Sequence, residues 1–346
     1  MLKIKNRIDS ELARFVESAD KFYSLKKISP LLSRTIKDFV SREGKRVRPA
    51  LFIIAYLGFT KNKAKNLYRS SLSVELLHDF LLIHDDIIDK SDLRRNKPSM
   101  HRIFDKHLKR YNNLKFTGED LAIVAGDMLY ALSIEALMSI KEDSKRKERA
   151  LKKFIEAAFF TEAGEFIELL EGARGIDRVK KSTIYKIYDF KTAHYTFSSP
   201  LSIGAILAGA DKKQIETLHQ FGMSLGRAFQ IRDDILNILA EEKETGKSTL
   251  TDLKEAKKTI LIWFAYNRSG KKDKAFIKKT LLKKNISRNN LLKMKKLITD
   301  TGSLDYALRQ IKSLLAKSEK IIRQSKMKLK YKNMLINYCG QLLNYK

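Results

Sequence analysis

Residues that interrupt or cross-link secondary structure are scarce in this chain. Its 346 residues include one cysteine, four prolines, 15 glycines and one tryptophan. The lone Cys339 excludes an internal disulfide framework and is typical of a protein from a reducing cytoplasm. Leucine and isoleucine recur at spacings of three and four residues through long stretches without proline. This pattern predicts an almost entirely α-helical protein, because it places apolar side chains on one face of a helix.

Long uninterrupted apolar runs are also missing. Residues 51–59 and 201–210 form the most apolar stretches, and both are shorter than the roughly 18–20 residues of a membrane span. Residues 1–5 lead into a mixed-charge helical pattern and not into a signal peptide. We therefore expect no membrane-spanning helix and a cytoplasmic location.

Acidic residues are outnumbered, with 40 Asp and Glu against 70 Lys and Arg, which gives a net charge of +30. Residues 271–346 carry 21 basic against 4 acidic residues. Such a charge attracts anionic membranes or nucleic acid. Lysine outnumbers arginine, however, and aromatic residues do not interleave as a base-stacking surface requires. We favour solvated helix faces and expect no nucleic-acid partner, while peripheral association with a membrane remains open.

Two short acidic motifs lie in Leu/Ile-rich sequence. Residues 85–89 read Asp-Asp-Ile-Ile-Asp, and residues 233–237 read Asp-Asp-Ile-Leu-Asn. In a helix, Asp85 and Asp89 are one turn apart and share a face. Neighbouring carboxylates repel each other, and a bound cation removes that cost. A single pair of this kind lies on a solvated helix face about as often as it binds a metal. Two pairs together predict facing helices that bind Mg²⁺ and a phosphorylated substrate.

Basic residues flank these motifs at positions suited to phosphate groups. Residues 44–49 read Gly-Lys-Arg-Val-Arg-Pro before an apolar helix, and a helix N-terminus is a natural anion site. His78 lies two helical turns before Asp85 and so on roughly the same face. Pro98 should hold Arg94 and Arg95 in a turn. Further cations follow at Lys191-Thr192, beside a kink expected at Pro200, and at Lys247 and Lys257 around an exposed loop.

Taken in order, these motifs resemble those of the trans-isoprenyl diphosphate synthases, the family of the farnesyl and geranylgeranyl diphosphate synthases. Residues 44–49 look like the GKRxRP motif of the family, and residues 85–95 like its first Asp-rich motif with an Arg pair. Residues 191–192 match its KT motif, residues 229–234 its FQxxDD sequence, and residues 246–257 its GKxxxxDL…K lid. The agreement of five motifs over about residues 40–260 is far more specific than any single motif.

The resemblance implies a single all-α domain over residues 1–346, built as one helical bundle around a central cavity and usually paired as a homodimer. It also implies an Mg²⁺-dependent, head-to-tail prenyltransferase. In that reaction an allylic diphosphate (dimethylallyl, geranyl or farnesyl) ionises with about three Mg²⁺, and isopentenyl diphosphate attacks the carbocation. The released diphosphate then accepts the proton. No protein nucleophile is needed, which fits the lack of a convincing Ser/His/Asp or Cys/His arrangement.

The resemblance also implies a role for each matching residue. The metal ligands would be Asp85, Asp89 and Asp233. The allylic diphosphate would be held by Arg94, Lys191, Thr192, Gln230, Lys247 and Lys257, and isopentenyl diphosphate by Lys45, Arg48, His78 and Arg95. The groups expected to act directly in ionisation are Asp85, Asp89, Arg94, Lys191, Asp233 and Lys247.

In this family, product length depends on the residues just before the first Asp-rich motif, because their side chains form the bottom of the cavity. Phe80 is bulky and should cap the growing chain, with Leu77 and Leu81 beside it. The sequence is in this respect similar to short-chain geranylgeranyl diphosphate synthases. We expect a C20 product, with the C15 farnesyl product as the alternative and a longer chain also open.

Three residues depart from the family pattern. Asn237 stands where many members have Asp, and its carbonyl can still bind a metal with less charge. Ala256 and Asn96 stand where glycine is common in the lid and after the Arg pair. We expect activity to survive all three changes.

Other functions remain as alternatives. A catalytically weak partner subunit is disfavoured by the intact Asp85, Asp89, Arg94, Arg95 and Asp233. Terpene cyclases and head-to-head synthases generally lack the basic turn at residues 44–49. A non-enzymatic binder of nucleic acid or membrane surfaces would leave the two Asp motifs unexplained.

Overall fold

The computed structural model describes residues 2–239, 253, 255, 257–283 and 285–342. The chain forms two compact units: unit 1 comprises residues 1–154 and 203–210, and unit 2 comprises residues 155–202 and 211–346. Among the described residues the only extended structure is a two-stranded hairpin, so the predicted all-α fold is confirmed. The single domain over residues 1–346 stays a prediction.

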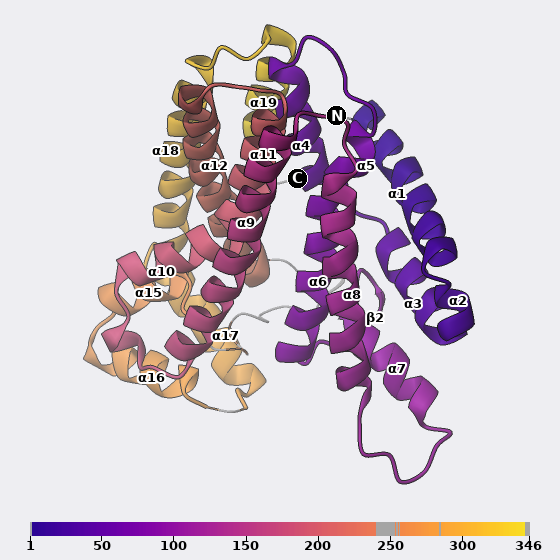
Figure 1. The fold of residues 1–346 in the computed structure, drawn as a ribbon. Helices are drawn as coiled ribbons and strands as arrows, with labels where there is room; N and C mark the ends of the chain where they lie inside the picture. Colours follow the sequence, from indigo (N-terminus) through magenta and orange to yellow (C-terminus); the bar gives the residue numbers. More distant parts are fainter. Residues whose placement is uncertain (1, 240–252, 254, 256, 284, 343–346) are drawn as a thin grey trace. The chain divides into compact units, whose positions relative to one another are not determined.

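Unit 1 is organised around helix α6, which packs against α3, α4, α5, α7 and α8 (Figure 1). Helix α4 is buried at almost every position, because its sequence is apolar on all sides. The elements of this unit are α1 (Leu2–Phe22), α2 (Leu25–Ile28), α3 (Pro30–Ser41), α4 (Val47–Phe59), α5 (Leu67–Ser71), α6 (Ser73–Ile88), β1 (Leu93–Arg94), β2 (Lys97–Pro98), α7 (Met100–Leu108) and α8 (Gly118–Met138).

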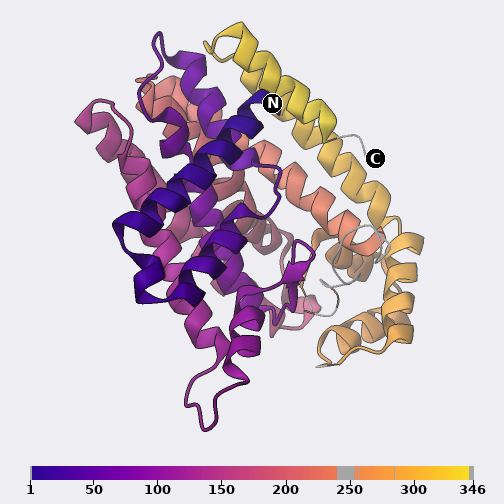
Figure 2. The same ribbon diagram turned by 90° about the vertical axis from the view of Figure 1, so that its right-hand side faces the viewer.

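Unit 2 is organised around the long helix α12, which packs against α18 and η2 and runs side by side with α18 in Figure 2. Its elements are η1 (Ile176–Arg178), α10 (Lys181–Tyr188), η2 (Asp189–Ser198), α12 (Lys212–Leu239), α15 (Ile260–Arg268), α16 (Lys271–Leu281), α17 (Arg288–Asp300), α18 (Ser303–Arg323) and α19 (Leu329–Gln341). Helices α9 (Ser144–Gly172) and α11 (Ser199–Leu207) belong partly to each unit.

Two expectations about charged stretches are wrong. The charged residues 141–149 were expected to form an exposed connection, but α9 begins at Ser144. Charged residues are compatible with a solvated helix face, and Glu148 pairs there with Lys152 one turn later at 2.6 Å. The described part of residues 271–346 forms four helices, α16 to α19, where two or three were expected.

The backbone change near Pro200 takes a different form from the expected kink. Residues Asp189–Ser198 form a π-helix immediately before it. Proline has no N–H to donate to the carbonyl four residues earlier, so the regular hydrogen-bond ladder cannot continue through this position. The wider turn carries Lys191 and Thr192, and π-helical segments frequently occur at functional sites.

Helix α8 corrects the expectation about membrane spans. Its 21 residues are long and apolar enough, by length and composition alone, to cross a membrane. This apolar stretch is not evident as one continuous run in the sequence, because single acidic residues interrupt it. Somewhat less than half of the most apolar stretch is buried, and the helix packs on α6 and α7. A core helix passes the same test, so the composition does not distinguish the two cases.

Candidate active site

The first acidic motif lies at the C-terminal end of α6. Asp86 is fully buried, whereas the side chain of Asp85 is 25% exposed. Asp89 caps the helix, with its backbone N–H donating to the carbonyl of Asp85 at 2.8 Å. Successive helical residues point about 100° apart, so the burial of Asp86 leaves Asp85 and Asp89 together on a partly exposed face. This confirms the predicted spacing and separates the middle carboxylate from the other two.

Arg94 closes the buried side of this motif. The hairpin of β1 and β2 pairs Arg94 with Lys97 and returns the chain towards α6. Arg94 Nε donates to Asp86 Oδ1 at 2.8 Å, and Nη2 lies close to both Asp86 and Asp85. These carboxylates raise the pKa of the Arg94 guanidinium, although burial opposes them. Arg94 was predicted to bind substrate, and in the structure it is 8% exposed and neutralises Asp86.

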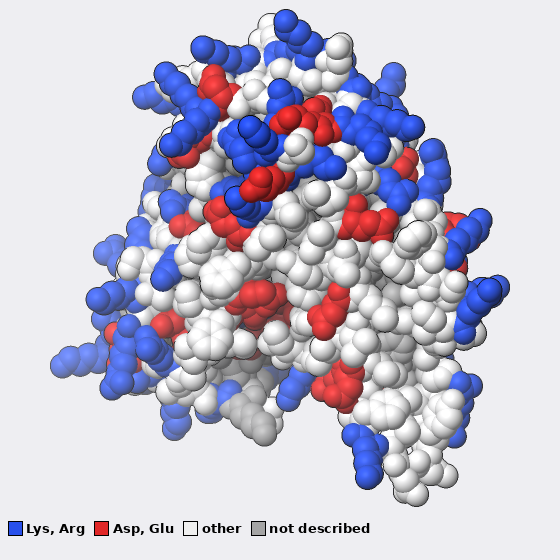
Figure 3. All heavy atoms as spheres, in the orientation of Figure 1, with Lys and Arg blue, Asp and Glu red and all other residues white. Residues whose placement is uncertain are grey.

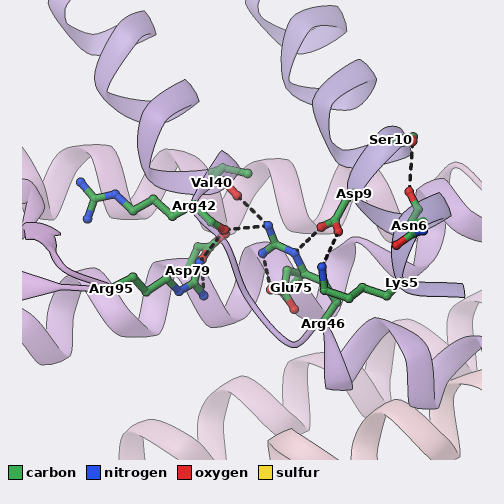
Figure 4. Close-up of polar contacts among 10 residues, drawn as sticks. All are labelled: Lys5, Asn6, Asp9, Ser10, Val40, Arg42, Arg46, Glu75, Asp79 and Arg95. Atoms are coloured by element: carbon green, nitrogen blue, oxygen red, sulfur yellow. Dashed lines mark hydrogen bonds and ion pairs between the residues drawn. The ribbon is translucent and has the colours of Figure 1, made fainter. Parts of the chain in front are cut away.

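Arg46 is the buried member of the basic turn (Figure 4). It precedes α4 in the left-handed conformation, with φ of 49°. Its guanidinium donates to Asp9 at 2.8 Å and to Glu75 at 2.7 Å, and Nη2 also bonds the carbonyl of Arg42 at 2.9 Å. Sequence reasoning counted three cations in this turn as one anion site. The structure instead commits Arg46 to the fold, because its side chain is only 2% exposed.

Arg42 is a positioning residue that no motif pointed to. Its Nη1 donates to the carbonyl of Arg94 at 3.1 Å and its Nη2 to the carbonyl of Pro98 at 2.9 Å. Asp38 holds the other side of the guanidinium at 2.9 and 3.1 Å. Arg42 thus clamps the hairpin at both ends of its tight turn. Its only sequence signal was its place two residues before the basic turn.

The residues predicted to hold isopentenyl diphosphate all belong to unit 1. Lys45 is exposed in the basic turn, and Arg48 lies in the first turn of α4. Arg95 is near enough to this turn that a Cβ at Gly44 would meet its guanidinium at 3.6 Å. Burial, reinforced by the charges of Arg48 and Arg95, lowers the pKa of His78 well below its usual value. The structure therefore gathers Arg48, His78 and Arg95 with His78 neutral at pH 7, able to donate a hydrogen bond without adding charge.

The residues predicted to set product length lie on α6, one to two turns before Asp85. Leu77 and Leu81 are buried, and Phe80 is partly exposed. The ring of Phe80 contacts Tyr130 of α8 with centroids 5.2 Å apart, and Tyr130 stacks on the buried Phe154 at 6.4 Å. Phe80 is therefore the outer member of a layer of three aromatic rings.

In unit 2, residues from three separate motifs line one pocket. Lys191 and Thr192 of η2, Gln230 of α12 and Lys257 all contribute to it. The hydroxyl of Thr192 donates to the amide oxygen of Gln230 at 2.5 Å. Lys191 contacts Glu168 at 2.5 Å and also pairs with Glu165. The two glutamates hold the lysine beside the pocket, and Glu168 itself lines it.

The second acidic motif repeats the division seen in the first. Asp234 is 2% exposed, whereas Asp233 and Asn237 are partly exposed. Asp234 accepts hydrogen bonds from the hydroxyl of Tyr188 and, at 2.9 Å, from the amide of Gln230. The backbone N–H of Ile260 donates to the same Tyr188 hydroxyl at 2.9 Å. Asp234 therefore ties α12 to α10 and, through Tyr188, to the start of α15.

Some predicted residues cannot be placed. Lys247, Ala256 and most of the predicted lid lie outside the described residues. Among the residues that are described, no group of three or more His, Cys, Asp or Glu side chains could hold a metal ion. Each helix places two oxygen-bearing side chains on a partly exposed face, Asp85 and Asp89 on α6 and Asp233 and Asn237 on α12. Such a set would fit Mg²⁺, because this ion keeps several waters and binds substrate phosphates as further ligands.

The chain is similar to known proteins of one family. Residues 29–298 match the model of the polyprenyl synthetase family. A geranylgeranyl diphosphate synthase of Sulfolobus acidocaldarius is 34% identical over 76% of this chain and 75% of its own length. A geranylfarnesyl diphosphate synthase of Aeropyrum pernix is 31% identical over 80% of this chain and 82% of its own. A geranylgeranyl pyrophosphate synthase structure from Corynebacterium glutamicum, complexed with isoprenyl diphosphate and magnesium, has a TM-score of 0.89 at 25% identity and covers 99% of each chain.

Proposed function

The chain belongs to the polyprenyl synthetase family, and on that premise we propose that it condenses isopentenyl diphosphate with an allylic diphosphate to a short-chain, all-trans prenyl diphosphate. The observation that carries the proposal is the pocket of unit 2, where Lys191, Thr192, Gln230 and Lys257 converge from three motifs. The two lysines supply the positive charge and the N–H donors that a diphosphate needs, and the Thr192 hydroxyl, which donates to Gln230, can accept or re-orient beside them.

The chemistry follows from where charge develops. The allylic C–O bond breaks, and its electron pair leaves with the diphosphate. Lys191 and Lys257 stabilise that charge. Mg²⁺ bound at Asp85, Asp89 and Asp233 would neutralise the leaving diphosphate as a Lewis acid. The double bond of isopentenyl diphosphate, held by Lys45, Arg48, His78 and Arg95, then forms the new C–C bond, and a proton passes to the released diphosphate. That the two acidic motifs face each other, as this scheme requires, stays a prediction.

The test of this function is direct. The protein is incubated with Mg²⁺, isopentenyl diphosphate and each allylic primer, and both diphosphate release and product length are measured. Lys191→Ala should lower kcat at least about tenfold, because it removes one charge from the leaving group. Lys180→Ala, at an exposed position before α10, is the matched control and should leave kcat unchanged. Wild-type protein that releases no diphosphate with any primer would refute the function.

For the product, we propose the C20 geranylgeranyl diphosphate. The named relatives make products of different length, so the family alone does not decide this point. The support comes from Phe80, whose ring is backed by Tyr130 and Phe154 and is therefore held in place as a floor. The C15 product is the alternative if the allylic chain stops one unit earlier.

For the assembly, we propose a homodimer that uses the exposed face of α8. Ile123, Val124 and Met138 are 40%, 55% and 38% exposed and lie on one side of the helix. Residues 116–140 contain no Lys or Arg although the chain carries 70, and Figure 3 shows the surface over α8 mainly uncharged with a few acidic patches. Depletion of lysine and exposure of aliphatic side chains are typical of subunit interfaces. Light scattering of wild-type protein and Val124→Lys tests this, and a monomeric wild type would refute it.

We also propose a cytoplasmic location. The support is the composition: the one cysteine, Cys339, is buried and reduced, and the substrates are highly charged and water-soluble. Fractionation of cells that express the protein tests this location, and recovery with the membranes after a high-salt wash would refute it.

A further inference from the structure

Asp79 is a buried carboxylate on α6 to which the proposed mechanism assigns no role. Asp79 is 0% exposed, and neither of its side-chain oxygens has a hydrogen-bond partner among the described residues. Burial, reinforced by the nearby Glu75, raises the pKa of this carboxyl to about 8. A carboxyl group in this position is costly, because buried polar groups normally need hydrogen bonds and buried charges need close partners. An apolar residue would cost the fold less, so its presence calls for a role.

Two carboxylates on the buried side of α6, Glu75 and Asp79, form ion pairs with different arginines. Arg46, Arg48 and Arg95 all act on it. Arg46 is already engaged by Glu75 at 2.7 Å and by Asp9 at 2.8 Å. Arg95 is the cation that ion-pairs with Asp79, with Nη2 3.7 Å from Oδ1 (Figure 4). Glu75 and Asp79, one helical turn apart on the buried side of α6, therefore each serve a different arginine.

Arg95 is held from two directions. Its backbone has φ of 55° and Asn96 has φ of 59°, so both residues of the hairpin turn are left-handed, which is strained for side chains other than glycine. Arg42 clamps the carbonyls on either side of that turn. The guanidinium is then fixed by Asp79 and by the carbonyl of Arg42, which accepts from Nη1 at 3.3 Å. A guanidinium has five N–H donors, so these two contacts leave others for a diphosphate.

We propose that Asp79 is a positioning residue, which holds the guanidinium of Arg95 in the orientation that binds the diphosphate of the non-allylic substrate. The inference rests on the proposed function and deepens it. It predicts that the energetic cost of burying Asp79 is repaid as affinity for isopentenyl diphosphate and not as stability of the fold.

The test is run at pH 9, above the raised pKa of Asp79, and compares Asp79→Asn, which keeps the shape and removes the negative charge, with Glu43→Gln, which removes an exposed charge beside the basic turn. Asp79→Asn should raise the KM for isopentenyl diphosphate about tenfold and change the KM for the allylic diphosphate less than about twofold. Glu43→Gln should change neither. An equal rise in both KM values, or no rise in the first, would overturn the proposal.

A double-mutant cycle separates positioning from general damage. On an Arg95→Ala background, Asp79→Asn should have little further effect on the KM for isopentenyl diphosphate, because the residue through which it acts is gone. Additive effects would refute the proposed coupling. Calorimetric titration with isopentenyl diphosphate alone repeats the comparison without turnover. If wild-type protein binds it but forms no product, only the proposed function fails, and if it does not bind, both proposals fail.

Discussion

Replacement of Arg46 should lower the free energy of unfolding far more than replacement of its neighbour Lys45, although both belong to one basic motif. Arg46 is 2% exposed and bonds two carboxylates at 2.7 and 2.8 Å. Removing one partner of a buried ion pair costs about 3–5 kcal/mol, because the other charge stays buried and unpaired. We expect Arg46→Gln to lower the free energy of unfolding by about this amount. Lys45 is exposed, and Lys45→Gln should change it by less than about 0.5 kcal/mol.

Urea denaturation followed by far-ultraviolet circular dichroism measures both variants at one pH and salt concentration. Arg46→Met combined with Glu75→Leu should recover much of the loss, because an apolar pair of similar volume has no charge to desolvate. Lys45→Gln should lose activity at low isopentenyl diphosphate concentration while it stays folded. The reasoning would be wrong if Arg46→Gln were within about 1 kcal/mol of Lys45→Gln, since Arg46 would then contribute no more than a surface residue.

Three further predictions test other parts of the structure. Phe80→Ala should lengthen the products, because it removes the outer ring of the aromatic layer, and unchanged products in a chromatographic assay would show that Phe80 is not the floor. Asp85→Asn should raise the Mg²⁺ concentration needed for half-maximal turnover at unchanged melting temperature, whereas Asp86→Asn should lower the melting temperature, because it leaves Arg94 buried without its main partner. The folded-state pKa of Asp79, about 8, lies above the unfolded value of about 3.9, so its contribution to stability is complete below the unfolded pKa and is lost as the pH rises through 8. The melting temperature of wild-type protein should therefore fall more between pH 6 and pH 9 than that of Asp79→Asn, and parallel curves would contradict the buried ionisation.

The helical fold and the position of each motif could be predicted from the sequence, because both depend on short-range geometry. The one-turn spacing of Asp85 and Asp89 places them on one face in any α-helix. Pro98 predicted a turn that contains the Arg pair, and the structure has a hairpin there. Helix boundaries were less predictable, since a charged stretch such as residues 141–149 can be either a loop or a solvated helix.

The ion pairs of the site could not be predicted, because they join residues far apart in the sequence. Asp9 and Arg46 are 37 residues apart, and Arg42 and Pro98 are 56 residues apart. No local sequence pattern indicates that Lys45 is exposed and Arg46 buried. Nor does any indicate that Lys191 pairs with both Glu165 and Glu168. These contacts depend on how elements distant in the sequence pack together, α1 with the basic turn, the end of α3 with the hairpin, and η2 with α9, which only the three-dimensional structure shows.

Three of the motifs contain one buried residue that maintains the fold beside a more exposed one that was predicted to bind. Arg46 is buried and Lys45 exposed, Asp86 is buried and Asp85 partly exposed, and Asp234 is buried and Asp233 partly exposed. Helix geometry permits this division in the two Asp pairs, because adjacent side chains point about 100° apart, so that one is buried while the other is partly exposed. Loss of activity on replacing Asp86 or Asp234 is therefore not evidence that either binds a metal. Only a variant with unchanged stability and an altered Mg²⁺ requirement identifies a ligand, so stability must be measured beside activity for every residue of these motifs.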